Sequence, residues 1–178
     1  VEAMGMLARC GARIKYGHSE VGNFTADGKV YEQNEIEFLP VDIEDAADQL
    51  VIAKWVMRQL AYTYGLELTF APKITVGKAG SGMHVHCRLM RDGESAMLCN
   101  GQLTDEARRA IAGFMMAGTS LPAFGNPHPL SFMRLVPHQE APTSLCWSFS
   151  NRSALVRVPL GWTAPMDMAH TANPAEEP

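Results

Sequence analysis

Long apolar runs are missing from the sequence, and none approaches the roughly 18 residues that a membrane-spanning helix needs. Positive charge is also scarce, because 15 Lys and Arg stand against 19 Asp and Glu, a formal net charge of −4. A chain with this balance does not attract polyanions over its whole surface. We therefore expect neither a nucleic-acid nor a membrane partner.

Cysteines are few and widely spaced, at Cys10, Cys87, Cys99 and Cys146, and no two form a C-x-x-C pair. A chain of 178 residues is long enough to bury a core without disulfides. The spacing therefore favours buried, reduced thiols and predicts a cytoplasmic protein.

Two nucleotide-binding signatures are also missing, the G-x-x-x-x-G-K-[ST] loop and the protein-kinase set. Hydrophobic residues at 47% and charged residues at 19% nevertheless indicate a folded chain.

The periodicities predict an α+β fold, mainly antiparallel sheet with helices packed on one face. Apolar residues at three- and four-residue steps indicate helices over about 43–64 and 104–118. Asp27-Gly28 is a hairpin turn signal. The other expected elements are a helix over 1–10, hairpin arms at 19–21 and 30–38, and strands at 14–18, 66–70, 83–90, 144–149 and 154–158.

The segment from Gly80 to His86 reads G-S-G-M-H-V-H. On a strand, His84 and His86 would point to one face, as ligands of a metal or of an anionic substrate would. Two half-exposed strand histidines without a ligand are the alternative.

Four carboxylates gather on the expected hairpin, at Glu20, Glu32, Glu35 and Glu37. Like charges on one face of a sheet repel each other, and a divalent cation with oxygen ligands, Mg²⁺ or Mn²⁺, would relieve that repulsion. An exposed edge strand protected by charge explains them equally well.

Three arginines, Arg134, Arg152 and Arg157, stand in apolar stretches that we interpret as strands. Guanidinium groups in such places need anionic partners, either phosphate or internal glutamates. Combined with the histidines and the glutamates, they fit metal-assisted phosphoryl transfer.

Five short segments follow one another along the chain. They are G-H-S-E-V at 17–21, Q-N-E at 33–35, G-S-G-M-H-V-H at 80–86, R-L-V-P-H-Q-E-A-P at 134–142 and N-R-S-A at 151–154. In this order they resemble the catalytic domain of the glutamine synthetase family, and the resemblance spans about 14–159.

The resemblance implies ATP-dependent ligation of ammonia to the side-chain carboxylate of glutamate through γ-glutamyl phosphate. It also implies two or more Mg²⁺ or Mn²⁺ ions per site and a homo-oligomeric parent enzyme. A ligase that joins glutamate to another amine, such as a polyamine, is an alternative, and a noncatalytic regulatory relative is another.

The resemblance also assigns a role to each matched residue. Glu140 would close the site, contact glutamate and take a proton from ammonium, and Arg152 would hold phosphate as it is transferred. The remaining roles are metal binding by Glu20, Glu35 and His84, glutamate binding by Gly80 and Arg134, and nucleotide binding by His86, Arg152 and Arg157.

The resemblance further implies that residues 1–178 are a central fragment of the catalytic domain. An N-terminal β-grasp domain and a C-terminal part, with further metal glutamates, would lie outside it. The chain departs from the family pattern at several places, which leaves the amine acceptor open. These places are a longer hairpin tip at 22–32, Lys15 in place of an acidic residue, Ala79 in place of Asn, and His138-Gln139 in place of Gly-Tyr.

Overall fold

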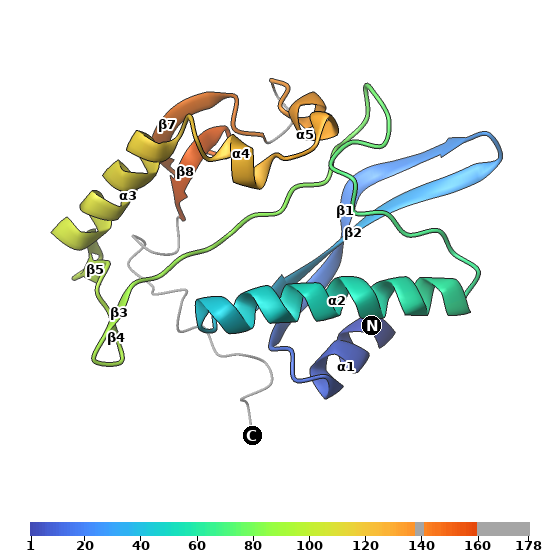
Figure 1. Cartoon of the computed structure of the whole chain (residues 1–178), viewed down its shortest axis with the longest axis horizontal. Helices are drawn as coiled ribbons and strands as arrows, with labels where there is room; N and C mark the ends of the chain where they lie inside the picture. The colour runs from blue at the N-terminus through green and yellow to red at the C-terminus, as the bar shows by residue number, and fades with distance from the viewer. Residues whose placement is uncertain (138–140, 160–178) are drawn as a thin grey trace. The chain divides into compact units, whose positions relative to one another are not determined.

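The computed structural model describes residues 1–137 and 141–159 (Figure 1). The chain divides into two compact units, Val1–Ala71 and Pro72–Pro178. Helices combine with mostly antiparallel strand pairs, which confirms the expected α+β class. Within the described ranges, no helix is both long enough and apolar enough to cross a membrane.

The first unit is a long hairpin with two helices (Figure 1). Its elements are α1 (Glu2–Arg9), β1 (Ile14–Ala26), β2 (Lys29–Phe38) and α2 (Ile43–Thr63). The core of this unit contains Leu7, Ala12, Ala53 and Val56, against which Ile36 and Phe38 of β2 pack.

The hairpin turns at Asp27-Gly28, as the sequence predicts. Both residues have positive φ, 51° and 75°, the conformation of the tight turn that suits twisted antiparallel strands. Phe24 and Tyr31 stack directly beside the turn, with ring centroids 4.6 Å apart. β1 runs without interruption through the expected strand at 14–18 and the expected arm at 19–21.

Over residues 72–137 and 141–159, the second unit has four short strands, three helices and a pair of longer strands. The short strands are β3 (Met90–Arg91), β4 (Glu94–Ser95), β5 (Leu98–Cys99) and β6 (Gln102–Leu103). The helices are α3 (Asp105–Ala117), α4 (Pro122–Gly125) and α5 (Pro129–Arg134), and the pair is β7 (Ser144–Phe149) and β8 (Ala154–Val158).

The N-terminus of α3 organises the core of the second unit. The Thr104 hydroxyl accepts a hydrogen bond from the Ala107 amide at 3.2 Å and donates one to the Ala96 carbonyl at 2.6 Å. This cap fixes the helix start that the sequence predicts. It also brings the helix against the core residues, which are Met97, Leu103, Ala107, Ile111 and Val158.

Two expected strands are wrong. Residues 66–70 form no strand, and over 83–90 only Met90 lies in one. Alternation favours an extended backbone, but a strand also needs a hydrogen-bonded neighbour, and no ladder forms over 80–89 in the described part of the chain. β7 and β8 lie where expected, yet they pair in parallel, unlike the other three pairs.

The expected burial of the cysteines is also wrong. Cys10, Cys87 and Cys99 are exposed, and Cys146 is half-buried. All four are free thiols.

We predict that Leu7→Ala will destabilise the fold by roughly 2–4 kcal/mol. Leu7 of α1 is fully buried in the core of the first unit, and truncation of its side chain leaves a cavity there. Urea unfolding measures the change. Leu66→Ala is the control, since Leu66 is 65% exposed and should cost under about 0.5 kcal/mol. Equal losses in the two variants would contradict this description of the core.

Candidate functional site

An irregularity in the β1–β2 pairing shapes the carboxylate cluster of the first unit. Next to the turn, Asn23 pairs with Glu32, but farther along Ser19 pairs with Asn34. Three residues of β1 therefore face a single residue of β2 at this point, a bulge that begins at Glu20. Bulges of this kind redirect side chains, and they are common beside functional sites.

The bulge places His18 opposite Glu35, and Glu20 follows two residues later on the same strand. His18 Nδ1 lies 3.5 Å from Glu20 Oε1, and His18 Nε2 lies 3.7 Å from Glu35 Oε2. The imidazole thus lies between the two carboxylates. One potential ligand atom from each of the three side chains lies within 4.8 Å of the others.

The carboxylates of this cluster repel each other. Partial burial raises the pKa of Glu35, and the hydrogen bond and negative charge of Glu20 raise it further, while His18 opposes the shift. The Glu35 side chain is still 43% exposed, so a ligand can reach it.

Glu37 and Glu32 do not join the cluster. The Lys15 ammonium lies 2.7 Å from Glu37 Oε1. Lys15, which stands where the family pattern has an acidic residue, therefore forms an ion pair within the hairpin. Tyr16 donates a hydrogen bond to the same carboxylate, which raises the pKa of Tyr16 to about 12. Glu32 is exposed, and it pairs with Asn23 beyond the bulge.

The arrangement suits a divalent cation. Oxygen ligands from two carboxylates with an adjacent imidazole match the preferences of Mg²⁺ and Mn²⁺. A cation between Glu20 and Glu35 would also remove the repulsion that raises the pKa of Glu35. His18, Glu20 and Glu35 therefore fit a metal site.

Gly17 permits the backbone approach on which this site depends. A methyl group at residue 17 would lie 2.9 Å from Met4 Sδ and 3.3 Å from the Glu35 carbonyl oxygen. The glycine before His18 therefore lets α1 and β2 close on the strand that carries the cluster.

The second unit contains a cluster of the opposite charge around His84. Desolvation lowers the pKa of His84 most, although part of its surface is exposed, and the positive charges of four neighbours lower it further. A neutral imidazole is the form that binds a metal. The neighbours, in order of their effect, are Arg134, Arg157, His86 and Arg152.

Arg134 lies directly against the glycine-rich loop. A methyl group at Gly80 would be 2.8 Å from Arg134 Cγ, and one at Gly82 would be 2.8 Å from Arg134 Cζ. Gly80 has no room for a side chain, because its methyl group would also meet the Pro72 carbonyl oxygen at 2.6 Å, whereas one at Gly82 would meet only the end of the Arg134 side chain.

The N-R-S segment is a turn that presents Arg152. Asn151 Oδ1 accepts hydrogen bonds from the Ser153 amide at 3.0 Å and from the Ser153 hydroxyl at 2.8 Å. Arg152 lies between these two residues, in the connection from β7 to β8, and Arg157 lies within β8. The flanking residues therefore fix the backbone of the arginine.

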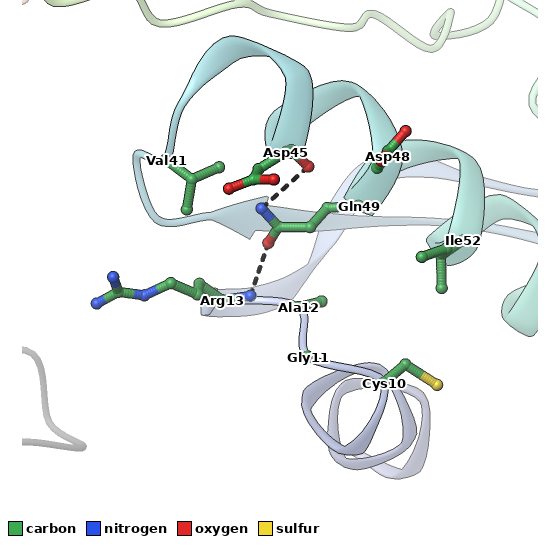
Figure 2. A pocket seen from close by; sticks show the side chains of 9 residues that line it. All are labelled: Cys10, Gly11, Ala12, Arg13, Val41, Asp45, Asp48, Gln49 and Ile52. Atoms are coloured by element: carbon green, nitrogen blue, oxygen red, sulfur yellow. Dashed lines mark hydrogen bonds between the residues drawn. The ribbon is translucent and has the colours of Figure 1, made fainter.

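A hollow of the first unit lies away from this cluster (Figure 2). It has a volume of about 250 Å³ and lies between α2 and the segment before β1. Gln49 spans it, accepting a hydrogen bond from the Arg13 amide at 2.7 Å and donating one to the Asp45 carbonyl at 3.3 Å. None of the expected site residues lines this hollow.

Comparison with known proteins identifies the family. The family model described as the glutamine synthetase catalytic domain matches residues 2–170. The chain belongs to the glutamine synthetase family. This confirms the resemblance drawn from the sequence, and the members of this family are glutamate–ammonia ligases.

Individual similar proteins belong to the same family. Glutamine synthetase of Thermus thermophilus is 39% identical over 161 residues, 89% of this chain and 34% of the relative. That of Frankia alni is 40% identical over 167 residues, 92% of this chain and 34% of the relative. The cryo-EM structure of Plasmodium falciparum glutamine synthetase superimposes with a TM-score of 0.78 at 26% identity, over 92% of this chain and 32% of that one. The chain thus spans about a third of the length of these glutamine synthetases.

The structure places the expected glutamine synthetase residues in two groups, each within its own unit. Glu20 and Glu35 come together in the first. In the second, Gly80 contacts Arg134, which shares the surroundings of His84 with the other basic residues. Glu140 lies outside the described residues.

Two expectations about these residues are wrong. His84 and His86 do not lie on a strand, so alternation does not explain their proximity. Arg134 ends helix α5 and Arg152 lies in the turn between β7 and β8, so of the three arginines only Arg157 lies in a strand. Sequence analysis also missed His18, although it stands two residues before Glu20 and so shares a face with it.

We predict that Glu35→Gln will stabilise the chain at pH 7 more than at pH 4. The pKa of Glu35 is raised above 4.5 in the folded state, so folding stability falls as pH rises from about 4.5 through that raised value. Gln removes this loss. Because the side chain is 43% exposed, we expect a gain under about 1 kcal/mol.

Urea unfolding at both pH values in metal-free buffer measures this difference. Glu32→Gln is the control on the same strand, and it should show no comparable gain. A Glu35→Gln variant no more stable than the parent at pH 7 would show that the repulsion is unimportant.

Proposed function

We propose that the chain is the central part of a glutamine synthetase catalytic domain and takes part in ATP-dependent ligation of ammonia to glutamate. The observation that carries the proposal is the basic cluster around His84 in a member of this family. Guanidinium groups near one imidazole are suited to bind an anionic ligand, and phosphate and carboxylate are the anions of this reaction.

The reaction has two steps. A side-chain carboxylate oxygen of glutamate attacks the γ-phosphorus of ATP, the bond to the bridging oxygen breaks and ADP leaves. Ammonia then attacks the acyl carbon of γ-glutamyl phosphate, and the carbon–oxygen bond to phosphate breaks. Charge on the phosphoryl oxygens is the main obstacle in such transfers, so guanidinium groups placed in advance lower the barrier.

Each residue then has a distinct task. Arg152 and Arg157 hold phosphate oxygens, and His86 contacts the nucleotide. Arg134 binds the carboxylate of glutamate beside Gly80, whose missing side chain leaves the backbone accessible. Glu140 accepts the proton that ammonium loses before it attacks.

Glu20 and Glu35, with His18 between them, would hold one divalent ion, and His84 would bind another. When bound, Mg²⁺ or Mn²⁺ supplies positive charge that neutralises the phosphates. Until then, the chain's own role is to hold two repelling carboxylates close together.

The rest of the proposal follows from the family. An N-terminal β-grasp domain and a C-terminal part with further metal ligands would complete the enzyme, which we propose to be a cytoplasmic homo-oligomer. A noncatalytic relative fits less well, because the matched residues that the structure describes still form charged clusters.

A different amine acceptor is the second candidate. It is favoured by Ala79 beside the glutamate-binding loop, where family members commonly carry Asn, and by the longer hairpin tip. Assay of the full-length enzyme with glutamate, ATP, Mg²⁺ and a panel of amines decides between the two. Product with ammonia supports glutamine synthesis, product only with a larger amine supports the alternative, and no product with any amine contradicts both.

We predict that Arg152→Ala in the full-length enzyme will lower kcat by about 10²–10³ and change the KM for glutamate little. A cation that acts on charge developing during transfer contributes mainly to the transition state. Steady-state kinetics measure both constants. Arg109→Ala on the exposed surface of α3 is the control. A raised KM with unchanged kcat would make Arg152 a simple binding residue.

We predict that Glu20→Gln will weaken Mn²⁺ binding at least about tenfold, because an amide replaces a charged oxygen ligand. Titration calorimetry on the full-length enzyme without nucleotide gives the affinity. Glu32→Gln, outside the cluster on the same hairpin, should bind as the parent does. Equal weakening in both variants would indicate a general charge effect and no ligand role for Glu20.

A further inference from the structure

Lys73 is an unusual residue for a loop. It is only 5% exposed, and no other charged side chain in the described ranges is buried to this degree. Its ammonium donates a hydrogen bond to the backbone carbonyl of Lys78, on the opposite side of the loop. A buried ammonium costs desolvation energy unless such partners compensate it, so its position here needs a reason.

The loop is also closed at its ends. The Ser81 amide donates a hydrogen bond to the Pro72 carbonyl at 2.9 Å. Between them, Ile74 is 45% exposed and Val76 is 74% exposed, so burial of these side chains does little to hold the loop. Its shape therefore depends mainly on polar contacts, including the one that crosses it from Lys73.

The closed end of this loop contacts Arg134. A methyl group at Gly80 would lie 2.6 Å from the Pro72 carbonyl oxygen and 2.8 Å from Arg134 Cγ. The loop backbone therefore touches the start of the loop on one side and Arg134 on the other. Any opening between Pro72 and Ser81 would move the backbone against which the arginine rests.

We propose that Lys73 is a positioning residue for the glutamate site: its buried ammonium holds the 72–81 loop closed, and the closed loop sets the position of Gly80 and of the Arg134 side chain. Lys73 itself does not contact substrate. The role toward glutamate rests on the proposed function, whereas the closure of the loop does not.

Hydrogen exchange of the full-length enzyme tests the closure without any substrate. Lys73→Met keeps the side-chain length and removes the donor, and we expect the Ser81 amide to exchange at least about tenfold faster. Lys78→Met is the matched control, since it keeps the carbonyl that Lys73 contacts and alters only an exposed side chain. Unchanged Ser81 exchange in Lys73→Met would overturn the proposal.

Steady-state kinetics of the full-length enzyme test whether the closed loop positions the glutamate-binding groups. We expect Lys73→Met to raise the KM for glutamate at least about tenfold, with kcat within about threefold and the KM for ATP within about twofold, because misplaced binding groups affect the ligand they hold. Faster Ser81 exchange with an unchanged KM for glutamate would overturn the positioning role. Equal increases in both KM values would also overturn it, since they would indicate general damage.

A control for unfolding and a second variant distinguish local opening of the loop from general damage to the fold. Peptides from α3 should exchange alike in all variants, and faster exchange there would show that the fold itself had changed. If Lys73→Met does not fold, Lys73→Gln, with a shorter neutral donor, should still speed Ser81 exchange about threefold, and no change would contradict the proposal. A parent enzyme that does not use glutamate would refute the proposed function, while the exchange experiment would still decide the closure of the loop.

Discussion

Like charges are held close together in both units of this chain, against their mutual repulsion. Two carboxylates share a site on the hairpin, and basic side chains surround His84 in the second unit. Repulsion between like charges and the desolvation of charged groups both oppose folding. The free energy for holding them must come from the surrounding backbone and core. Like charges gathered in this way in a folded protein are typical of a binding site for ligands of the opposite charge.

The backbone holds these charges by local devices. A bulge in the β1–β2 ladder sets His18 between Glu20 and Glu35, and Gly17 allows the neighbouring elements to approach. The long ladder on both sides of the bulge, with Ile36 and Phe38 packed on the core, keeps the register from slipping. In the second unit a side-chain-stabilised turn performs the same task for Arg152. In both units, local backbone structure therefore positions the candidate functional side chains.

In the proposed function, the two clusters would serve the same reaction. The chain covers about a third of the related enzymes, so it contains only part of the site that they would form. The carboxylate cluster and the basic cluster nevertheless each form within one unit.

The sequence by itself determined the elements that depend on near neighbours. The helices over Ile43–Thr63 and Asp105–Ala117, the Asp27-Gly28 turn and the positions of β7 and β8 follow from periodicity, capping and turn preference, all of which act over a few residues. The matched segments also indicated the family, and the site residues that they suggest stay predictions. Only the tertiary structure decided that His18 faces Glu35, that 83–89 form no strand and that Arg134 ends a helix against Gly80. Each of these depends on a register or a partner distant in the sequence, and alternation within a segment carries no information about either.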